Sequence, residues 1–220
     1  MRLLELFSGT QSVGKVAREL GFEVVCLDRD VEADIKCDIM DWDYKVFEPG
    51  CFDVIWASPP CTEYSRAKTV GVRKIDEANA IVQRTLDIAF YFLPTYCIIE
   101  NPQTGLLKDQ EMMQDISYDD VDYCKYGLSY RKRTRLWNNI LAWEPRQLCQ
   151  KDCGHMDGNR HMETAQQGPS KGAPTAGRQQ HKQSELYMVP PDLIREVFEA
   201  MLQDHARRLM TSRIGADIHI

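Results

Sequence analysis

The sequence contains no apolar run that approaches the roughly 18 consecutive residues needed to cross a membrane. It also lacks a secretory signal, because MRLLELFSG leads directly into a strand-like pattern without an apolar segment and a small-residue cleavage site. These absences argue against membrane association and predict an intracellular protein, in the cytoplasm or, in a eukaryote, in the nucleus. In that compartment the eight cysteines are expected to be thiols or metal ligands and not disulfides.

An overall excess of positive charge is missing as well, since the formal net charge is −6. This value argues against a protein that is basic all over, but it does not describe how the charge is distributed. Residues 131–182 carry ten Lys and Arg against four Asp and Glu. A second basic cluster, in a stretch without an acid, consists of Arg66, Lys68, Arg73 and Lys74. The asymmetry permits a face that binds phosphates, although charge runs more often form ordinary solvated surface.

Strand-like and helix-like segments alternate along the first hundred residues. LLELF, FEVVCLD, FDVIWAS and TYCIIEN are strand-like, whereas SVGKVAREL and EANAIVQRTLDIAFYFL have helical periodicity. Such alternation predicts an α/β fold of the Rossmann-like kind, a mixed but mainly parallel sheet with helices on both faces. Ligands in this architecture bind beyond the carboxyl ends of the strands. The FSG, SPPC and EN motifs all lie where a strand-like segment ends.

The length of 220 residues predicts a single domain, residues 1–220. Its character changes over residues 144–185, where five glycines and three prolines occur with almost no apolar periodicity. We therefore expect a loop-rich insert in that range. The segment PPDLIREVFEAMLQDHARRL then regains helical spacing, with Pro191 suited to the first turn, and predicts a closing helix.

The run LFSGTQSVG follows the first strand-like segment and suits a ligand. Small residues let backbone amides approach a bound group, and a helix N-terminus favours anions. Asp28 lies 19 residues after Gly9, near the spacing at which a carboxylate accepts the hydroxyls of a ribose. Because the turn offers one glycine followed by Thr, Gln and Ser, and not GxGxxG, the run favours an adenosine-containing cofactor without requiring a pyrophosphate.

Asp38 is interpreted either as a receptor for the adenine amino group or as a loop cap. The residues expected to bind the cofactor are Phe7, Ser8, Gly9, Thr10, Ser12, Val13, Asp28, Arg29, Asp38, Ile39 and Pro59.

The turn SPPCTEYS places Cys61 directly after a strand-like segment. Pro59 and Pro60 fix the backbone and exclude helix there, which would aim the thiol into a cleft. A lone cysteine in a loop is usually inert, so Cys61 alone is only a candidate nucleophile. TYCIIENP brings Glu100 and Asn101 to the same edge of the sheet. A partly desolvated carboxyl group at Glu100 could donate a proton or a hydrogen bond, unless it caps a following helix.

FSGTQS, Asp28, SPPCTEYS and IIENP, in this order, resemble the successive motifs of the cytosine-5 DNA methyltransferase family. In that family a Pro-Pro-Cys turn carries the nucleophile and a Glu-Asn pair binds the cytosine. YGLSYRKRTRLWNN is similar to the family's strand with a Gln-x-Arg-x-Arg pattern, and LYMVPPDL to its closing Asn-x-Val-Pro-Pro motif. The resemblance covers residues 1 to about 140 and about 185 to 205.

This resemblance implies a Rossmann-like methyltransferase that uses S-adenosylmethionine and acts on DNA. Cys61 would add to carbon 6 of cytosine while Glu100 binds the ring nitrogen and the exocyclic amine. One of the catalytic arginines, Arg133 or Arg135, would contact the base oxygen or a neighbouring phosphate. A base inside a duplex is out of reach, so the nucleotide must be flipped or single-stranded.

The sequence departs from the family pattern in several places. The second motif reads ENP instead of ENV, Lys132 or Tyr130 stands for the glutamine, and Tyr187 stands for the closing asparagine. Only about 45 residues are available where the family has a target-recognition region. Recognition of bases is therefore expected to be minimal or to come from a protein partner. RNA, as in a tRNA-methylating branch of the family, and a non-catalytic DNA-binding relative are alternatives; intact Cys61 and Glu100 disfavour the latter.

The insert also carries a C-x3-C-x-H-x5-H array formed by Cys149, Cys153, His155 and His161. These residue types and this spacing are compatible with tetrahedral zinc, which would hold a segment without a core of its own. The alternative is a flexible basic loop that becomes ordered on DNA. Apart from Cys61, the remaining cysteines are interpreted as buried or strand-edge residues: Cys26, Cys37, Cys51, Cys97 and Cys124.

Overall fold

A seven-stranded sheet forms the centre of the computed structural model, which describes residues 1–165 and 179–216. The strand order is β3-β2-β1-β4-β5-β7-β6. The five strands from β3 to β5 are parallel, and β7 runs antiparallel to both β5 and β6. The bounds are β1 (Arg2–Leu6), β2 (Glu23–Asp28), β3 (Ile35–Lys36), β4 (Val54–Ala57), β5 (Tyr96–Pro102), β6 (Tyr118–Asp122) and β7 (Arg133–Asn138). The mixed, mainly parallel sheet expected from the sequence is confirmed.

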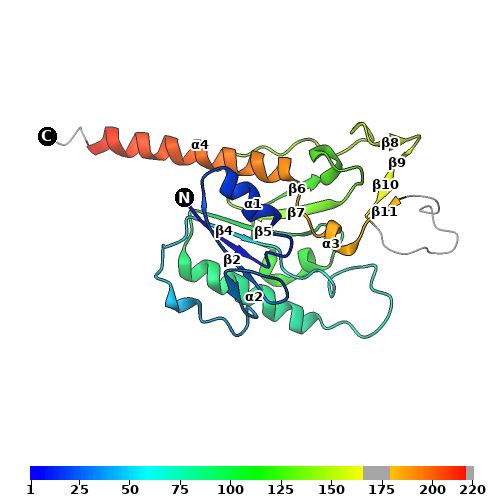
Figure 1. Ribbon diagram of the computed structural model, residues 1–220, viewed down its shortest axis with the longest axis horizontal. Helices are drawn as coiled ribbons and strands as arrows, with labels where there is room; N and C mark the ends of the chain where they lie inside the picture. The colour runs from blue at the N-terminus through cyan, green and yellow to red at the C-terminus, as the bar shows by residue number, and fades with distance from the viewer. Residues whose placement is uncertain (166–178, 217–220) are drawn as a thin grey trace.

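Helices cover both faces of this sheet (Figure 1). One face carries α1 (Ser12–Glu19) and α4 (Pro191–Ala216), and the other carries α2 (Ile75–Phe92). The short helical segments are η1 (Tyr44–Val46), η2 (Leu107–Asp109), η3 (Glu111–Met113), η4 (Tyr123–Tyr126) and α3 (Gln183–Leu186). No helix of the described residues is long and apolar enough to cross a membrane.

β4, at the centre of the sheet, is apolar throughout because both of its faces are buried. Along β4, Val54 and Trp56 pack under α1 and α4, whereas Ile55 and Ala57 pack under α2. This alternation follows from the two-residue period of a strand. Apolar side chains therefore fill the space between the sheet and the helices on both faces, and polar groups gather mainly where the strands end.

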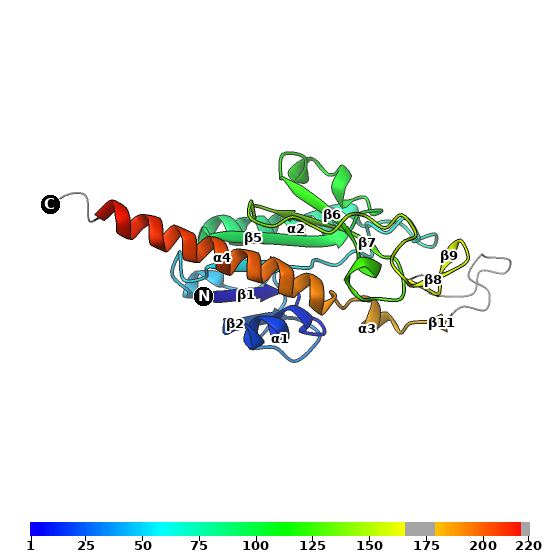
Figure 2. The ribbon, with the colours of Figure 1, turned by 90° about the horizontal axis from the view of Figure 1, so that it is seen from above.

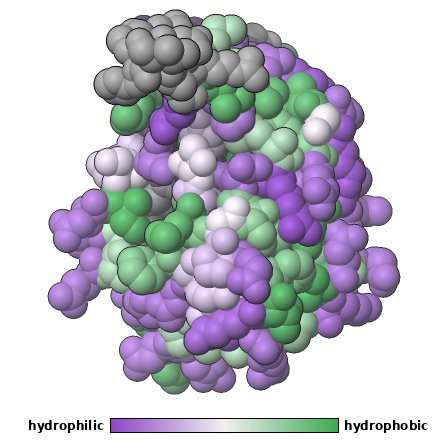
Figure 3. Space-filling model, turned by 90° about the vertical axis from the view of Figure 1, so that its left-hand side faces the viewer, coloured by the Kyte–Doolittle hydropathy of each residue, from purple (hydrophilic) through white to green (hydrophobic). Residues whose placement is uncertain are grey.

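The closing helix α4 begins at Pro191, as the sequence predicts. Its apolar stripe is fully buried and consists of Leu193, Ile194, Val197, Phe198 and Met201. From residue 206 to 210 the side chains are exposed, and the helix extends beyond the sheet (Figures 1 and 2). The end at which the parallel strands begin shows a mixture of hydrophilic and apolar residues (Figure 3). The motifs singled out in the sequence lie at the opposite end.

Up to residue 182, the described part of the insert after β7 contains only loops and two-residue strands. β8 (Met156–Asp157) pairs with β9 (Arg160–His161), and β10 (Glu163–Thr164) pairs with β11 (Gln179–Gln180). Neither pair joins the seven-stranded sheet. Residues 166–178 of the expected insert lie outside the described residues.

Phe198 should be among the side chains that stabilise the fold most. Its ring is fully buried and lies 4.9 Å from the Phe22 ring and 5.9 Å from the Trp56 ring, centroid to centroid. Phe198→Ala is expected to lower the free energy of urea unfolding by about 3–5 kcal/mol. Phe90→Ala in α2 is the control, because Phe90 is 81% exposed and its loss should change that free energy by under about 0.5 kcal/mol. Equal effects of the two substitutions would contradict this account of the core.

Candidate active site

A cavity of about 410 Å³ opens at the carboxyl ends of the parallel strands. Its size lies within the range of about 300–1,000 Å³ that small-molecule and cofactor sites occupy. The lining includes every residue expected from the sequence to bind the cofactor: Phe7, Ser8, Gly9, Thr10, Ser12, Val13, Asp28, Arg29, Asp38, Ile39 and Pro59. Cys61, Glu100 and Asn101 line the same cavity.

The turn between β1 and α1 forms one wall of the cavity and is tied to the end of β2. Phe7, Gly9 and Gln11 all have a positive φ, which lets the chain fold tightly there. The Gly9 amide donates a hydrogen bond of 2.8 Å to one carboxylate oxygen of Asp28. The other oxygen accepts from the amides of Asp30 and Val31. Asp28 therefore fixes the turn as well as facing the cavity.

Asp38 combines the two interpretations that the sequence leaves open. Its carboxylate accepts a hydrogen bond from the Met40 amide, so it does cap the local loop. It also lines the cavity and accepts from Arg29 at 3.0 Å. The Met40 amide and the Arg29 guanidinium together lower the pKa of Asp38. An ionised acceptor is thus available beside the cavity.

Two buried polar atoms of the lining lack a hydrogen-bond partner among the described residues. They are the Ser8 hydroxyl and the side-chain oxygen of Asn101. Buried polar atoms are rarely left unpaired unless a bound group completes them. Together with the Gly9 turn and the Asp28 carboxylate, they fit a polar, adenosine-containing cofactor such as S-adenosylmethionine.

Glu5 lies on β1 beneath this wall and is not among the residues expected from the sequence. Its carboxylate oxygen accepts from the Gly14 amide at 3.1 Å, and a Cβ at position 14 would lie 2.5 Å from that oxygen. Burial raises the pKa of Glu5 to about 7. A glycine at position 14 thus allows α1 to approach a carboxyl group that titrates near neutrality.

The SPPC turn and the end of β5 form the opposite wall. The Asn101 amide donates a hydrogen bond of 2.8 Å to the Pro59 carbonyl, which joins the two motifs. Glu100 is only 5% exposed and accepts from the Tyr123 hydroxyl at 2.9 Å. Because the next helical segment, η2, begins at Leu107, Glu100 does not cap a helix.

Cys61 faces both a carboxyl group and a lysine. Burial raises the pKa of Cys61 above the ordinary value for a thiol; the positive charge of Lys132 opposes this shift and Glu100 reinforces it. The Lys132 ammonium lies 3.8 Å from a Glu100 oxygen and donates to the Leu186 carbonyl. The thiol is therefore largely protonated at neutral pH, with a positive charge nearby that favours the thiolate.

Arg133 and Arg135 do not line this cavity. Each forms a bidentate ion pair with the carboxylate of the residue opposite it on β6: Arg133 with Asp122, and Arg135 with Asp120. The physical reason is strand alternation: Leu136 pairs with Glu100, so the arginines point to the other face of the sheet. On the Glu100 side, Lys132 is a basic group that lines the cavity; a base or phosphate contact by Arg133 or Arg135 stays a prediction.

The second basic cluster is largely neutralised by residues from outside its own stretch. Lys68 pairs with Glu63, Lys74 with Glu77, and Arg66 lies 3.6 Å from Asp109. Arg73 donates to three backbone carbonyls of the same loop. These side chains therefore organise the loop after Cys61 as much as they offer positive charge.

Comparison with known proteins adds independent evidence. The chain is 34% identical over 215 residues to a frog virus 3 (isolate Goorha) protein named "Probable DNA (cytosine-5)-methyltransferase", which covers 90% of this chain and 99% of that protein. The chain belongs to the cytosine-5 DNA methyltransferase family. No family model matches it.

Solved structures of methyltransferases share the fold of this family member. A candidate DNA modification methyltransferase encoded within an E. coli prophage matches with a TM-score of 0.52 at 14% identity, over 68% of this chain and 52% of that one. The Entamoeba histolytica methyltransferase EhMeth matches with a TM-score of 0.52 at 15% identity, over 68% and 56%. The chain thus spans little more than half of these structures, but nearly all of the frog virus protein.

Three residues of this methyltransferase site were not expected from its sequence. Lys132 could have been found from the alternation of the arginine strand, which places it on the Glu100 face. Tyr123 could not, because its contact with Glu100 depends on how β6 and η4 fold back. Glu5 carried a signal in being the single charged residue of the first strand-like segment.

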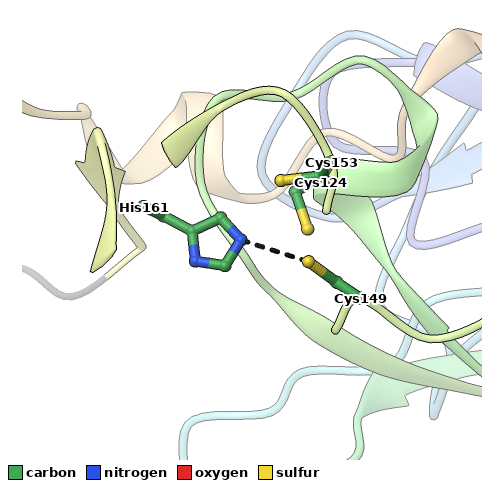
Figure 4. A group of neighbouring side chains, drawn as sticks. All are labelled: Cys124, Cys149, Cys153 and His161. Atoms are coloured by element: carbon green, nitrogen blue, oxygen red, sulfur yellow. Dashed lines mark hydrogen bonds between the residues drawn. The ribbon is translucent and has the colours of Figure 1, made fainter. Parts of the chain in front are cut away.

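A second constellation lies outside the cavity. Cys124, Cys149, Cys153 and His161 bring their ligand atoms within 4.8 Å of one another (Figure 4). The expected array differs by one residue, because Cys124 of η4 takes the place of His155. In the β8–β9 hairpin His161 pairs with Met156, while the His155 carbonyl accepts from Met162. The two histidines therefore point to opposite faces of the hairpin.

The shifted pKa of Glu5 predicts a pH dependence of stability. A carboxyl group whose folded pKa is raised binds its proton more tightly in the folded state, so its contribution is full below about pH 4.5 and is lost as the pH rises through 7. In the wild type, the free energy of unfolding should fall by about 3 kcal/mol between pH 4.5 and 7 because of Glu5. In Glu5→Gln this fall should be absent. Urea unfolding at several pH values measures it; parallel profiles for the two proteins would refute the assignment.

The charge of Lys132 should govern the reactivity of Cys61. Lys132→Met removes the positive charge that opposes the effect of burial, so the pKa of Cys61 should rise further. Alkylation of Cys61 by iodoacetamide at pH 8, followed by peptide mass spectrometry, should then be slower than in the wild type. Lys132→Arg keeps the charge and is the matched control. Unchanged alkylation in Lys132→Met would show that this charge does not act on the thiol.

Proposed function

We propose that this family member transfers a methyl group from S-adenosylmethionine to carbon 5 of cytosine in DNA through a covalent adduct of Cys61. The observation that carries the proposal is the shared cavity: Cys61 and Glu100 stand on one wall, and the Gly9 turn and Asp28 stand on the other. One cavity is thus lined by a candidate nucleophile, a candidate base-binding carboxyl group and a turn suited to the cofactor. The printed name of the frog virus relative supports DNA as the substrate.

Cytosine needs activation, because its carbon 5 is a poor nucleophile. The Cys61 sulfur would form a bond to carbon 6, and the electron pair of the 5,6 double bond would move toward carbon 5 and the ring nitrogen at position 3. Glu100, held by the Tyr123 hydroxyl, would hydrogen-bond that nitrogen and the exocyclic amine, stabilising the developing charge. When bound, S-adenosylmethionine supplies an electrophilic methyl group that carbon 5 accepts.

The adduct must then collapse. A base removes the proton at carbon 5, the 5,6 double bond forms again, and the carbon–sulfur bond to Cys61 breaks. The returning thiolate lies in a buried site, where the neutral thiol is favoured and the positive charge of Lys132 opposes that preference. Lys132 would therefore stabilise the sulfur at the two moments when it carries negative charge.

The cofactor would be held by the wall between β1 and β2. Asp28 would accept the ribose hydroxyls and Asp38 the adenine amino group, while the β1–α1 turn around Ser8 and Gly9 would contact the methionine part. Tyr187 and Val189, from the closing motif, also line the cavity and would cover it. The unpaired Ser8 hydroxyl supports this arrangement.

Target recognition is proposed to be minimal or shared with a protein partner. The described insert offers only the two-residue strands β8 to β11 where a recognition region would lie. Flipping the nucleotide out of a duplex costs a few kcal/mol, which phosphate contacts would have to offset. A DNA substrate would place the enzyme inside a cell, as expected from the sequence.

A trapped adduct tests the proposal. The protein is incubated with S-adenosylmethionine and a DNA duplex containing 5-fluorocytosine, whose fluorine cannot leave as a proton does, and the adduct is read by denaturing electrophoresis and peptide mass spectrometry. An adduct at Cys61 is expected; Cys61→Ala should abolish it and Cys97→Ala, which alters a different thiol, should retain it. Glu100→Gln should form adduct at least about 100-fold more slowly, by loss of charge stabilisation.

The same experiment with a 5-fluorocytosine RNA of equal sequence separates the substrates. An adduct on the RNA and none on the DNA would show that RNA is the substrate and that DNA is not. Adduct on neither, or undiminished adduct with Cys61→Ala, would overturn the mechanism.

A further inference from the structure

We propose that Cys124, Cys149, Cys153 and His161 bind one zinc ion, and that this ion fastens the insert to the segment that positions Glu100. Three thiols and an imidazole are a set of ligands typical of structural zinc. All four side chains converge on one point between η4 and the insert (Figure 4). The proposal does not depend on the methyl-transfer reaction.

The distances are close to those of a tetrahedral site. Bonds of about 2.3 Å to sulfur and 2.0 Å to nitrogen place a sulfur and a nitrogen ligand about 3.5 Å apart, and two sulfurs about 3.8 Å apart. The Cys149 sulfur lies 3.5 Å from the His161 Nε2, and no pair of the four ligand atoms exceeds 4.8 Å. A shift of about 1 Å in the widest pair would close the coordination shell.

The backbone around Cys149 already supports a thiolate. The Lys151 amide donates a hydrogen bond of 3.3 Å to the Cys149 sulfur. Lys151, between the two cysteines, has a positive φ of 70°, and Gly154, directly after Cys153, has a positive φ of 79°. This turn presents Cys149 and Cys153 to the same point, although they are separated by three residues.

Polar contacts such as the Lys125–Asp152 and Arg146–Glu196 ion pairs tie the described insert to the rest of the chain, but it has almost no apolar core. Between residues 144 and 165 the only buried residue is Cys149. The β8–β9 hairpin has two residues in each strand and pairs with no further strand. An isolated hairpin of this size is at best marginally stable in water, so a metal ion would supply what an apolar core supplies elsewhere.

The proposed zinc site is linked to the cavity wall that carries Cys61 and Glu100 through two adjacent residues, Asp122 and Tyr123. Cys124 follows Tyr123, whose hydroxyl donates to Glu100. On the other side, the Cys149 amide donates at 3.0 Å to the fully buried Asp122, which also holds Arg133. Binding Cys124 and Cys149 to one ion would fix η4 from both sides. Tyr123 would then act as a positioning residue for Glu100.

Metal analysis of the full chain, purified without chelators, tests the proposal. Elemental mass spectrometry should find about one zinc per chain. Cys153→Ser and His161→Ala should lower the zinc content at least severalfold. His155→Ala, on the opposite face of the hairpin, and Cys51→Ser should keep it. Loss of zinc in His155→Ala with retention in His161→Ala would overturn the ligand assignment.

Because a ligand variant could lose metal by failing to fold, a second measurement uses the unaltered protein. Zinc is removed with a chelator and replaced by Co²⁺, which should give the visible bands of a tetrahedral ion and a sulfur-to-metal charge-transfer band. Zinc far below one per chain without such bands would overturn the proposal, as would an intact mass lower by two hydrogens, the sign of a disulfide.

Hydrogen exchange tests the link to the catalytic wall. Chelation should raise exchange in residues 123–126 and 149–161 and leave β1 protected. Unchanged exchange in residues 123–126 would show that the ion does not hold η4.

Discussion

Burial of the central strands on both faces is the constraint from which the rest of this structure follows. Leu4 and Leu6 on one side of β1, and Leu3 on the other, fill most of the space beside this strand with apolar side chains. Reactive groups therefore stand at strand ends, where the backbone leaves the ladder. The Gly9 turn, Asp28, Cys61 and Glu100 are widely separated in the chain, yet they meet because parallel strands end at one edge.

The same constraint explains how much the sequence could predict. Apolar runs followed by polar motifs identify the strand ends, and so the cofactor wall and Cys61 follow from the sequence without coordinates. The family resemblance added the roles of Cys61 and Glu100. Lys132 was not expected at the site, although it precedes Arg133 by one residue and so lies on the opposite face of the strand. The pairing of β5 with β7 shows that this face is the one that carries Glu100.

Tertiary proximity limits prediction at the proposed metal site. Cys149, Cys153 and His161 lie close in sequence, and their spacing suggested a ligand array. Cys124 lies 25 residues before Cys149 and looked like an ordinary buried thiol. Its nearness depends on η4 returning to the insert after β6, which no local pattern encodes. The presence of His161 in the cluster and the absence of His155 from it depend on the register of the two-residue hairpin, which decides which histidine lies on the side of the cysteines.

The buried position of Cys61 has a consequence for the resting enzyme. Oxidants and electrophiles in a cell attack thiolates far faster than neutral thiols. Because desolvation raises the pKa of this thiol, the proposed nucleophile is mostly neutral and reacts slowly with such reagents. The burial that slows ionisation of Cys61 therefore also protects its sulfur from oxidation.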